Sequence, residues 1–144
     1  MRQSFDLSSF LPYLLNQAAE VTSRAFQDSY RDHGLTRTEW RVMANLAAHP
    51  DLTASDIGRI TFTDKTKVSR AVQALEDAGL LHRQTDAQDR RRETLALTDA
   101  GRILCRQIEL KAMDFDAALR ERLGEGQARD LAAALQRLIE DQGK

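Results

Sequence analysis

The sequence predicts a mainly helical fold that carries one small β-hairpin. Apolar residues recur at intervals of three and four along most of the 144 residues, and paired polar residues suited to capping open several of these segments. One stretch near residue 90 instead alternates apolar and polar residues on both sides of a charged turn. The chain is long enough to bury a core of its own, and its low Pro and Gly content favours long helices.

The N-terminal segment predicts a long helix with one apolar face. Pro12 is tolerated only in a first helical turn, so this helix should begin near Ser9 and continue toward a terminator at Gly34. Its apolar residues are spaced 4-3-4-3-4, close to a heptad seam: Leu7, Leu11, Leu14, Ala18, Val21 and Ala25. A helix with such a face needs a partner to cover it.

A capping box predicts the start of the second helix. The Thr36 hydroxyl is placed to accept from the N–H of Glu39, whose carboxylate reaches back to the N–H of Thr36. Leu35 and Trp40 stand at the positions of a hydrophobic staple, and the helix should run to about Ala48.

Two further cap signals predict a short helix, a turn and another helix. Thr53 with Asp56 opens a helix to about Ile60; Asp64 then caps a helix over Lys65–Ala78. One face of this last helix is apolar, at Val68, Ala71, Val72, Leu75 and Ala78. Its other faces are polar and basic, at Lys65, Thr66, Lys67, Ser69, Arg70 and Gln73. This arrangement is typical of a helix-turn-helix.

Leu80–Thr85 and Glu93–Leu97 are predicted to form a hairpin around the charged turn. Between residues 59 and 92 there are eight Lys or Arg against five Asp or Glu. This segment therefore carries +3 and the rest of the chain −4, because the whole chain carries −1. A basic helix and hairpin on a weakly acidic body favour a protein that binds nucleic acid reversibly.

The C-terminal part predicts two more helices. Thr98 is a cap candidate for a long helix to about Leu123, broken by Gly124 and Gly126. The long helix has an apolar side at Leu104, Cys105, Ile108, Ala112, Phe115, Leu119 and Leu123, and the last helix has one at Leu131, Ala134, Leu135, Leu138 and Ile139. We expect the terminal helices, in segments 1–34 and 98–144, to pack across a two-fold axis, with segment 35–97 as the nucleic-acid-binding unit.

Composition narrows the class of protein. No apolar run approaches a membrane span, no signal peptide is evident, and the single Cys105 suits a reducing cytoplasm. Ser69, His82 and Asp86 lack the nucleophile elbow of a hydrolase, and the three His residues lack metal-ligand spacing. With no Gly-rich phosphate loop either, we expect no enzyme activity, no metal and no cofactor.

Four motifs at fixed offsets resemble the MarR family of bacterial winged helix-turn-helix regulators. They are Val68-Ser69-Arg70, Leu75-Glu76-Asp77-Ala78-Gly79-Leu80-Leu81, Asp86-Ala87-Gln88-Asp89-Arg90-Arg91 and Leu97-Thr98-Asp99-Ala100-Gly101. The sequence departs from the family at Ala87, where Pro is frequent, and at Lys67, where a small Thr is frequent. The resemblance implies a homodimeric transcriptional regulator, most often a repressor, that binds a palindromic operator and is commonly released by a small aromatic or phenolic ligand.

The helix-turn-helix geometry assigns expected contacts on double-stranded DNA. The start of the second helix enters the major groove, where Arg70 is suited to guanine and Lys65 and Lys67 to phosphates; Thr66, Ser69 and Gln73 share this face. By the resemblance, Arg91 at the hairpin tip reaches the minor groove, with Asp89 orienting it through a salt bridge. Arg90 and Arg92 are expected to reach phosphates.

An effector site is only weakly indicated. The aromatic and basic candidates near the junction of the terminal helices and the DNA-binding unit are Tyr13, Phe26, Tyr30, His33, Arg37 and Trp40. Each of these residues also suits a purely structural role. Cys105 lies on an apolar helix face, which favours a buried thiol over a redox switch. An adaptor that keeps the fold without binding DNA is the alternative function, although it would not need three consecutive arginines.

Overall fold

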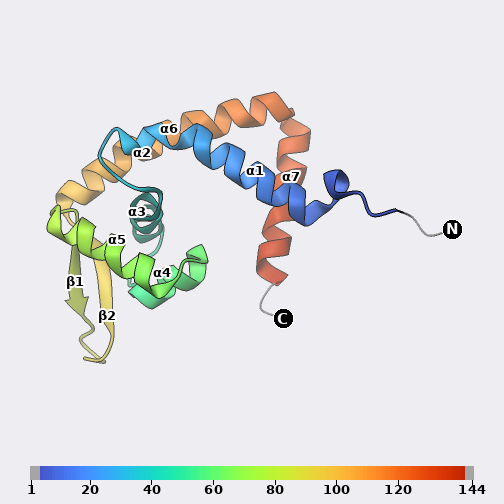
Figure 1. Cartoon of the computed structure of the whole chain (residues 1–144). Helices are drawn as coiled ribbons and strands as arrows, with labels where there is room; N and C mark the ends of the chain where they lie inside the picture. The colour runs from blue at the N-terminus through green and yellow to red at the C-terminus, as the bar shows by residue number, and fades with distance from the viewer. Residues whose placement is uncertain (1–3, 142–144) are drawn as a thin grey trace. The chain divides into compact units, whose positions relative to one another are not determined.

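The computed structural model describes residues 4–141, and it confirms the mainly helical fold with a single hairpin (Figure 1). The elements are η1 (Leu7–Ser9), α1 (Leu11–Phe26), α2 (Asp28–Arg31), α3 (Arg37–Ala48), α4 (Ala54–Thr61), α5 (Lys65–Asp77), β1 (Leu81–Thr85), β2 (Glu93–Leu97), α6 (Asp99–Leu123) and α7 (Glu125–Glu140). Two compact units divide the chain, Met1–Ile108 and Glu109–Lys144, so α6 contributes to both. None of the described helices is long and apolar enough to cross a membrane.

The N-terminal segment differs from the single helix that we expected. A short 3₁₀ helix, η1, comes first, and α1 starts at Leu11 with Pro12 in its first turn. The helix is interrupted at Gln27, whose N–H bonds to the carbonyl of Arg24, only three residues back, at 3.3 Å. After α2 the chain turns at Gly34, where φ is +78°, so the predicted terminator is confirmed.

Both predicted capping boxes are present. The Thr36 hydroxyl accepts from the Glu39 N–H at 3.2 Å while the Glu39 carboxylate accepts from the Thr36 N–H at 3.3 Å. At α4 the equivalent bonds between Thr53 and Asp56 measure 3.0 and 2.9 Å. Each box satisfies two main-chain N–H groups that a helix start would otherwise leave unpaired.

The core of the first unit joins α3, α4, α5, the hairpin and the start of α6. Among its most deeply buried side chains are Val42, Met43, Ile57, Val68, Val72, Leu75, Leu81 and Ile108. Strands β1 and β2 pair antiparallel from Leu81↔Leu97 to Thr85↔Glu93, and the Leu95 N–H also donates to the Leu52 carbonyl at 2.9 Å. The hairpin is thereby tied to the loop before α4.

Gly101 is needed where α6 meets the loop between α5 and β1. A Cβ placed on Gly101 would lie 2.0 Å from the carbonyl oxygen of Leu80, which is far inside any normal contact. The same carbonyl accepts from the Thr98 N–H at 3.1 Å. The Thr98 hydroxyl in turn accepts from the Gly101 N–H at 3.0 Å, which confirms Thr98 as the predicted cap. The small residue therefore allows α6 to start directly against this loop.

Two details of the predicted helices were wrong. Ala78, expected on the apolar face of α5, is exposed, because the helix ends at Asp77 and the chain turns at Gly79 with φ +75°. Gly126 was expected to help break the C-terminal helices, but it lies within α7. The break is made by Gly124, whose φ is +89°.

The turn between α4 and α5 holds a strained aromatic residue. Phe62 has φ +54° and ψ +41°, the left-handed region that disfavours a residue with a Cβ, yet its side chain is 76% exposed. The Thr61 hydroxyl donates to the Ile57 carbonyl at 2.7 Å at the end of α4. Asp64 follows and caps α5 by accepting from the Lys67 N–H at 2.9 Å, as predicted.

Candidate nucleic-acid interface

The buried face of α5 determines which of its side chains meet solvent. Val68, Ala71, Val72 and Leu75 are all buried against the core. The opposite side is exposed and carries the predicted DNA contacts Lys65, Thr66, Lys67, Ser69, Arg70 and Gln73. With Asp64 as its N-cap, the N-terminal half of α5 is a regular helix whose polar side is exposed.

The hairpin forms the wing, whose tip (residues 86–92) is closed by main-chain hydrogen bonds. The Asp86 N–H donates to the Arg92 carbonyl at 2.8 Å, and the Arg92 N–H donates to the Asp89 carbonyl at 2.9 Å. The Asp86 carboxylate accepts from the Gln88 N–H at 2.9 Å. These bonds give the tip a defined shape even though most of its side chains are exposed.

Asp89 acts differently from the prediction. It was expected to orient Arg91 through a salt bridge, but its carboxylate accepts from the main-chain N–H of Arg91 at 3.0 Å. Within residues 4–141, the Arg91 guanidinium makes no ion pair with Asp89. Asp89 therefore shapes the turn that presents Arg91.

The eight cations of segment 59–92 fall into two groups. Three are held in ion pairs: Arg59 with Asp56 at 3.2 Å, Arg83 with Glu93 at 3.0 Å and with Glu76 at 3.3 Å, and Arg92 with Asp86 at 3.5 Å. Five are exposed and form no ion pair within the described part of the chain: Lys65, Lys67, Arg70, Arg90 and Arg91. These five unpaired cations lie on only two elements, the first half of α5 and the wing tip.

Arg83, which the sequence did not single out, links α5 to the wing. Besides its two carboxylates, it donates to the side-chain oxygen of Gln73 at 3.4 Å, while the Gln73 amide nitrogen donates to Asp77 at 2.8 Å. Hydrogen bonding to Glu93 is the main reason that the pKa of Arg83 is raised. Gln73 is thus bonded at both ends of its amide, so a base contact would require it to give up one of these bonds.

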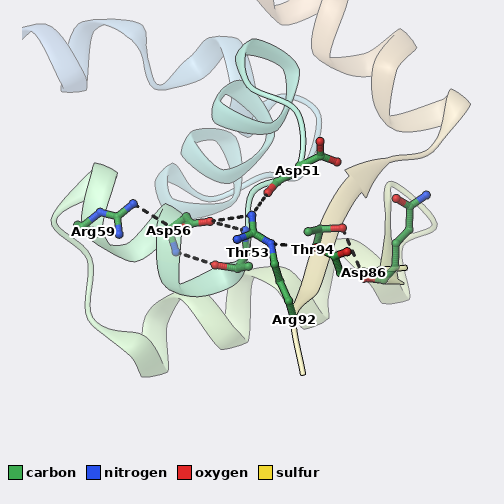
Figure 2. Close-up of polar contacts among 8 residues, drawn as sticks. Asp51, Thr53, Asp56, Arg59, Asp86, Arg92 and Thr94 are labelled. Atoms are coloured by element: carbon green, nitrogen blue, oxygen red, sulfur yellow. Dashed lines mark hydrogen bonds and ion pairs between the residues drawn. The ribbon is translucent and has the colours of Figure 1, made fainter. Parts of the chain in front are cut away.

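Arg92 lies at the β2 end of the wing tip, and its side chain contacts the loop before α4. Figure 2 shows its guanidinium turned toward the start of α4, where it donates to the Asp51 carbonyl at 2.7 Å. The Asp56 carboxylate lies 3.9 Å from the same nitrogen. This placement differs from the phosphate contact expected of Arg92.

The effector candidates are only partly brought together. The rings of Phe26 and Tyr30 lie 6.2 Å apart, and those of Phe26 and Trp40 lie 6.1 Å apart, all against the core. Arg37 forms an ion pair with Glu20 at 3.3 Å, and this hydrogen-bonded contact raises the pKa of Arg37 and lowers that of Glu20.

The remaining effector candidates and the thiol lie elsewhere. The side chain of Tyr13 on α1 is 37% exposed, and His33 is exposed in the loop before α3. The Cys105 thiol is buried and donates to the Met43 carbonyl at 3.8 Å. The predicted buried position of Cys105 is confirmed.

A family model described as the MarR family matches residues 33–92, which contain α3, α4, α5 and most of the hairpin. The regulator TtmR of Methylorubrum extorquens is 30% identical over 96 residues, covering 67% of this chain. The match covers 49% of TtmR, so the chain spans about half of that relative's length.

Solved structures share the whole fold. The MarR family transcriptional regulator SPO1453 from Silicibacter pomeroyi is 28% identical with a TM-score of 0.84, covering 95% of this chain and 98% of that one. Staphylococcus aureus MepR in complex with DNA has a TM-score of 0.77 at 22% identity, covering 91% and 95% of the two chains, which shows a common fold alone. From its motifs, its winged helix-turn-helix and these similarities, the chain belongs to the MarR family.

Proposed function

We propose that this protein is a transcriptional regulator that binds double-stranded DNA in a sequence-specific manner. The observation that carries the proposal is the placement of the five unpaired cations on the first half of α5 and on the wing tip. Cations without protein partners are available to neutralise phosphates and to read bases. The shared fold of MepR, which has been crystallised with DNA, supports the same reading.

Each cation has a proposed role in the complex. Arg70 reads a guanine in the major groove with its two-pronged guanidinium, and Lys65 and Lys67 neutralise phosphates beside it. Arg91 enters the minor groove and Arg90 contacts a phosphate. Thr66 and Ser69 supply hydroxyls on the same face of α5.

We propose that the protein acts as a homodimer on a palindromic operator. Within the first unit, α1 leaves Leu11 70% and Val21 66% exposed, and within the second unit α7 leaves Leu138 57% and Ile139 60% exposed. Apolar helix faces of this kind are usually covered by a partner, and a second copy would place two α5 helices on two half-sites. A compact dimer over a promoter blocks polymerase without further parts, so we propose repression, in the cytoplasm where the bacterial chromosome lies.

A small aromatic effector is the remaining part of the proposal. The cluster of Phe26, Tyr30 and Trp40, with Arg37 beside it, supplies ring faces and a cation that suit an aromatic carboxylate. Binding there would release the operator if it favoured a dimer whose α5 helices no longer match the half-sites.

Fluorescence anisotropy on a duplex from the protein's own upstream intergenic region tests the function. Binding that survives scrambled competitor, with two chains per duplex, is expected; Arg70→Gln should weaken it by about 1–3 kcal/mol and relax its sequence preference. Lys65→Gln should instead lower the slope of log K against log salt by about 1. A folded dimer that prefers no duplex, even among randomised sequences, would favour a protein-interaction adaptor.

A panel of aromatic carboxylates added to the same complex tests for an effector. Release by one compound, lost in Arg37→Gln while the affinity for DNA stays unchanged, would place that effector at the aromatic cluster. Release that persists unchanged in Arg37→Gln would argue against this site.

A further inference from the structure

We propose that Arg92 is a positioning residue that fixes the wing against the start of α4, and that it does not contact DNA. The consequence for DNA affinity rests on the proposed function, whereas the positioning itself concerns the free protein.

The guanidinium of Arg92 joins both ends of the wing tip to the start of α4, which is distant in the sequence. Its Nη2 donates to the Asp51 carbonyl at 2.7 Å and lies 3.9 Å from the carboxylate of Asp56, and its Nε lies 3.5 Å from the carboxylate of Asp86 (Figure 2). Asp51 lies in the loop before α4, and Asp56 is part of the capping box of α4. Asp86 is the first residue after β1. A single side chain thus ties both ends of the wing tip to the helix-turn-helix.

The loop before α4 has a left-handed residue, Asp51, at the point where Arg92 binds its main chain. Asp51 adopts φ +62°, a left-handed conformation that an Asp tolerates better than most residues but that still costs free energy. Its carbonyl accepts from Arg92 in that conformation, and the next residue, Leu52, bridges to Leu95 in β2. The main-chain bridge and the arginine contact therefore lie next to one another and hold the same two segments together.

The surroundings of Arg92 disfavour a phosphate. Asp56 and Asp86 place two carboxylates within 4 Å of the guanidinium, and a phosphate approaching it would meet their negative charge. Arg91 and Arg90, one and two residues earlier, have no such partner among residues 4–141. Because each ion pair of a partly exposed arginine is weak by itself, the value of the three contacts lies in the geometry that they impose on the wing.

The first test compares Arg92→Gln, Arg92→Lys and the matched control Arg90→Gln on a duplex that the wild-type protein selects from a random pool. Arg92→Gln should lower the affinity about tenfold with an unchanged salt slope, whereas Arg90→Gln should lower the slope by about 1. Arg92→Lys should behave like Arg92→Gln, because an ammonium keeps the charge but lacks the planar fork. Recovery of affinity by the Lys variant, or a lowered slope in Arg92→Gln, would show a phosphate contact and overturn the proposal.

A trimmed duplex separates positioning of the wing from a general loss of structure. On a version of the duplex that lacks the outer base pairs reached by the wings, Arg92→Gln should bind as tightly as the wild-type protein. An equal loss on the full and the trimmed duplex would mean that the variant damages the fold as a whole and not the wing alone.

Hydrogen exchange of the free protein tests the positioning even if no duplex binds. The Leu95 N–H donates to the Leu52 carbonyl, and the Asp86 N–H donates to the Arg92 carbonyl. Both N–H groups should exchange at least tenfold faster in Arg92→Gln than in the wild-type protein, and at the wild-type rate in Arg90→Gln. Unchanged exchange in both variants would overturn the proposal. Failure of the wild-type protein to select a duplex, together with faster exchange in Arg92→Gln, would contradict the proposed function alone.

Discussion

Replacing Gly101 by Ala should destabilise the protein, although Ala is the better helix former. Gly101 is the third residue of α6, and a methyl group there would come within 2.0 Å of the Leu80 carbonyl oxygen. A main-chain atom cannot rotate away as a side chain does, so either α6 or the loop before β1 must move by more than 1 Å, taking about 3.2 Å as a tolerable carbon–oxygen contact.

The magnitude follows from three contributions. Overpacking of this kind costs about 1–3 kcal/mol, and a contact with the main chain belongs at the upper end of that range. Moving the Leu80 carbonyl also weakens its 3.1 Å hydrogen bond from the Thr98 N–H, which contributes about 1 kcal/mol. Ala returns up to about 1 kcal/mol through its helix propensity. The net expectation is a loss of about 2–3 kcal/mol in the free energy of unfolding.

Urea denaturation followed by circular dichroism measures this loss, at one fixed protein concentration because the proposed dimer would make apparent stability depend on concentration. Gly126→Ala is the matched control: Gly126 also lies in the first turn of a helix, and a Cβ there meets no heavy atom within 4 Å. That variant should be neutral or gain up to about 1 kcal/mol. If Gly101→Ala were as stable as the wild-type protein, the close approach of α6 to Leu80 would be refuted.

Three further predictions concern other parts of the first unit. Phe62→Gly should raise the free energy of unfolding by up to about 1 kcal/mol in the same urea assay. Glycine adopts the left-handed backbone conformation of residue 62 without strain, and the exposed Phe62 ring contributes little packing. A lower free energy of unfolding would mean that the ring makes a stabilising contact. The pKa of Asp56 is lowered from 3.8, chiefly because its carboxylate accepts a hydrogen bond from the Thr53 N–H. The ionised Asp56 carboxylate should therefore stabilise the fold fully above pH 3.8, and this stabilisation should be lost as the pH falls through the pKa of Asp56 in the folded protein. The stability gap between wild type and Asp56→Asn, measured by urea unfolding at several pH values, should therefore narrow on acidification, and a gap that widens would contradict the assignment. Cys105 is 1% exposed, so a thiol reagent should modify it only as the protein unfolds. Rapid labelling of the native protein would contradict this prediction and favour a redox role for Cys105.

The sequence predicted those parts of the fold that depend on neighbouring residues. The capping boxes at Thr36 and Thr53 and the cap at Asp64 are made between residues three apart, so the spacing of residue types was sufficient to find them. The hairpin was similarly predicted from alternation and a charged turn. In the N-terminal helix, by contrast, the apolar spacing carried no sign of the interruption at Gln27.

Contacts between distant segments were not predictable from local patterns. Arg92 looks like Arg90 and Arg91 in the sequence, yet its carbonyl partner Asp51 lies 41 residues away. The pairing of Arg83 with Glu76 and Glu93 also needs the hairpin to fold back beside α5. A run of arginines indicates a basic surface, but only the fold separates the cations held by the protein from those available to DNA.

The preference of the protein for its own selected duplex over a scrambled one tests the central claim most directly. Measured by anisotropy at physiological salt, the wild-type protein should prefer the selected duplex by a factor of about 10³ or more. Arg70→Gln should reduce that ratio, because a base contact is lost, while Lys65→Gln should weaken both duplexes and leave the ratio unchanged. A wild-type ratio near one would contradict sequence-specific recognition by α5 and the wing.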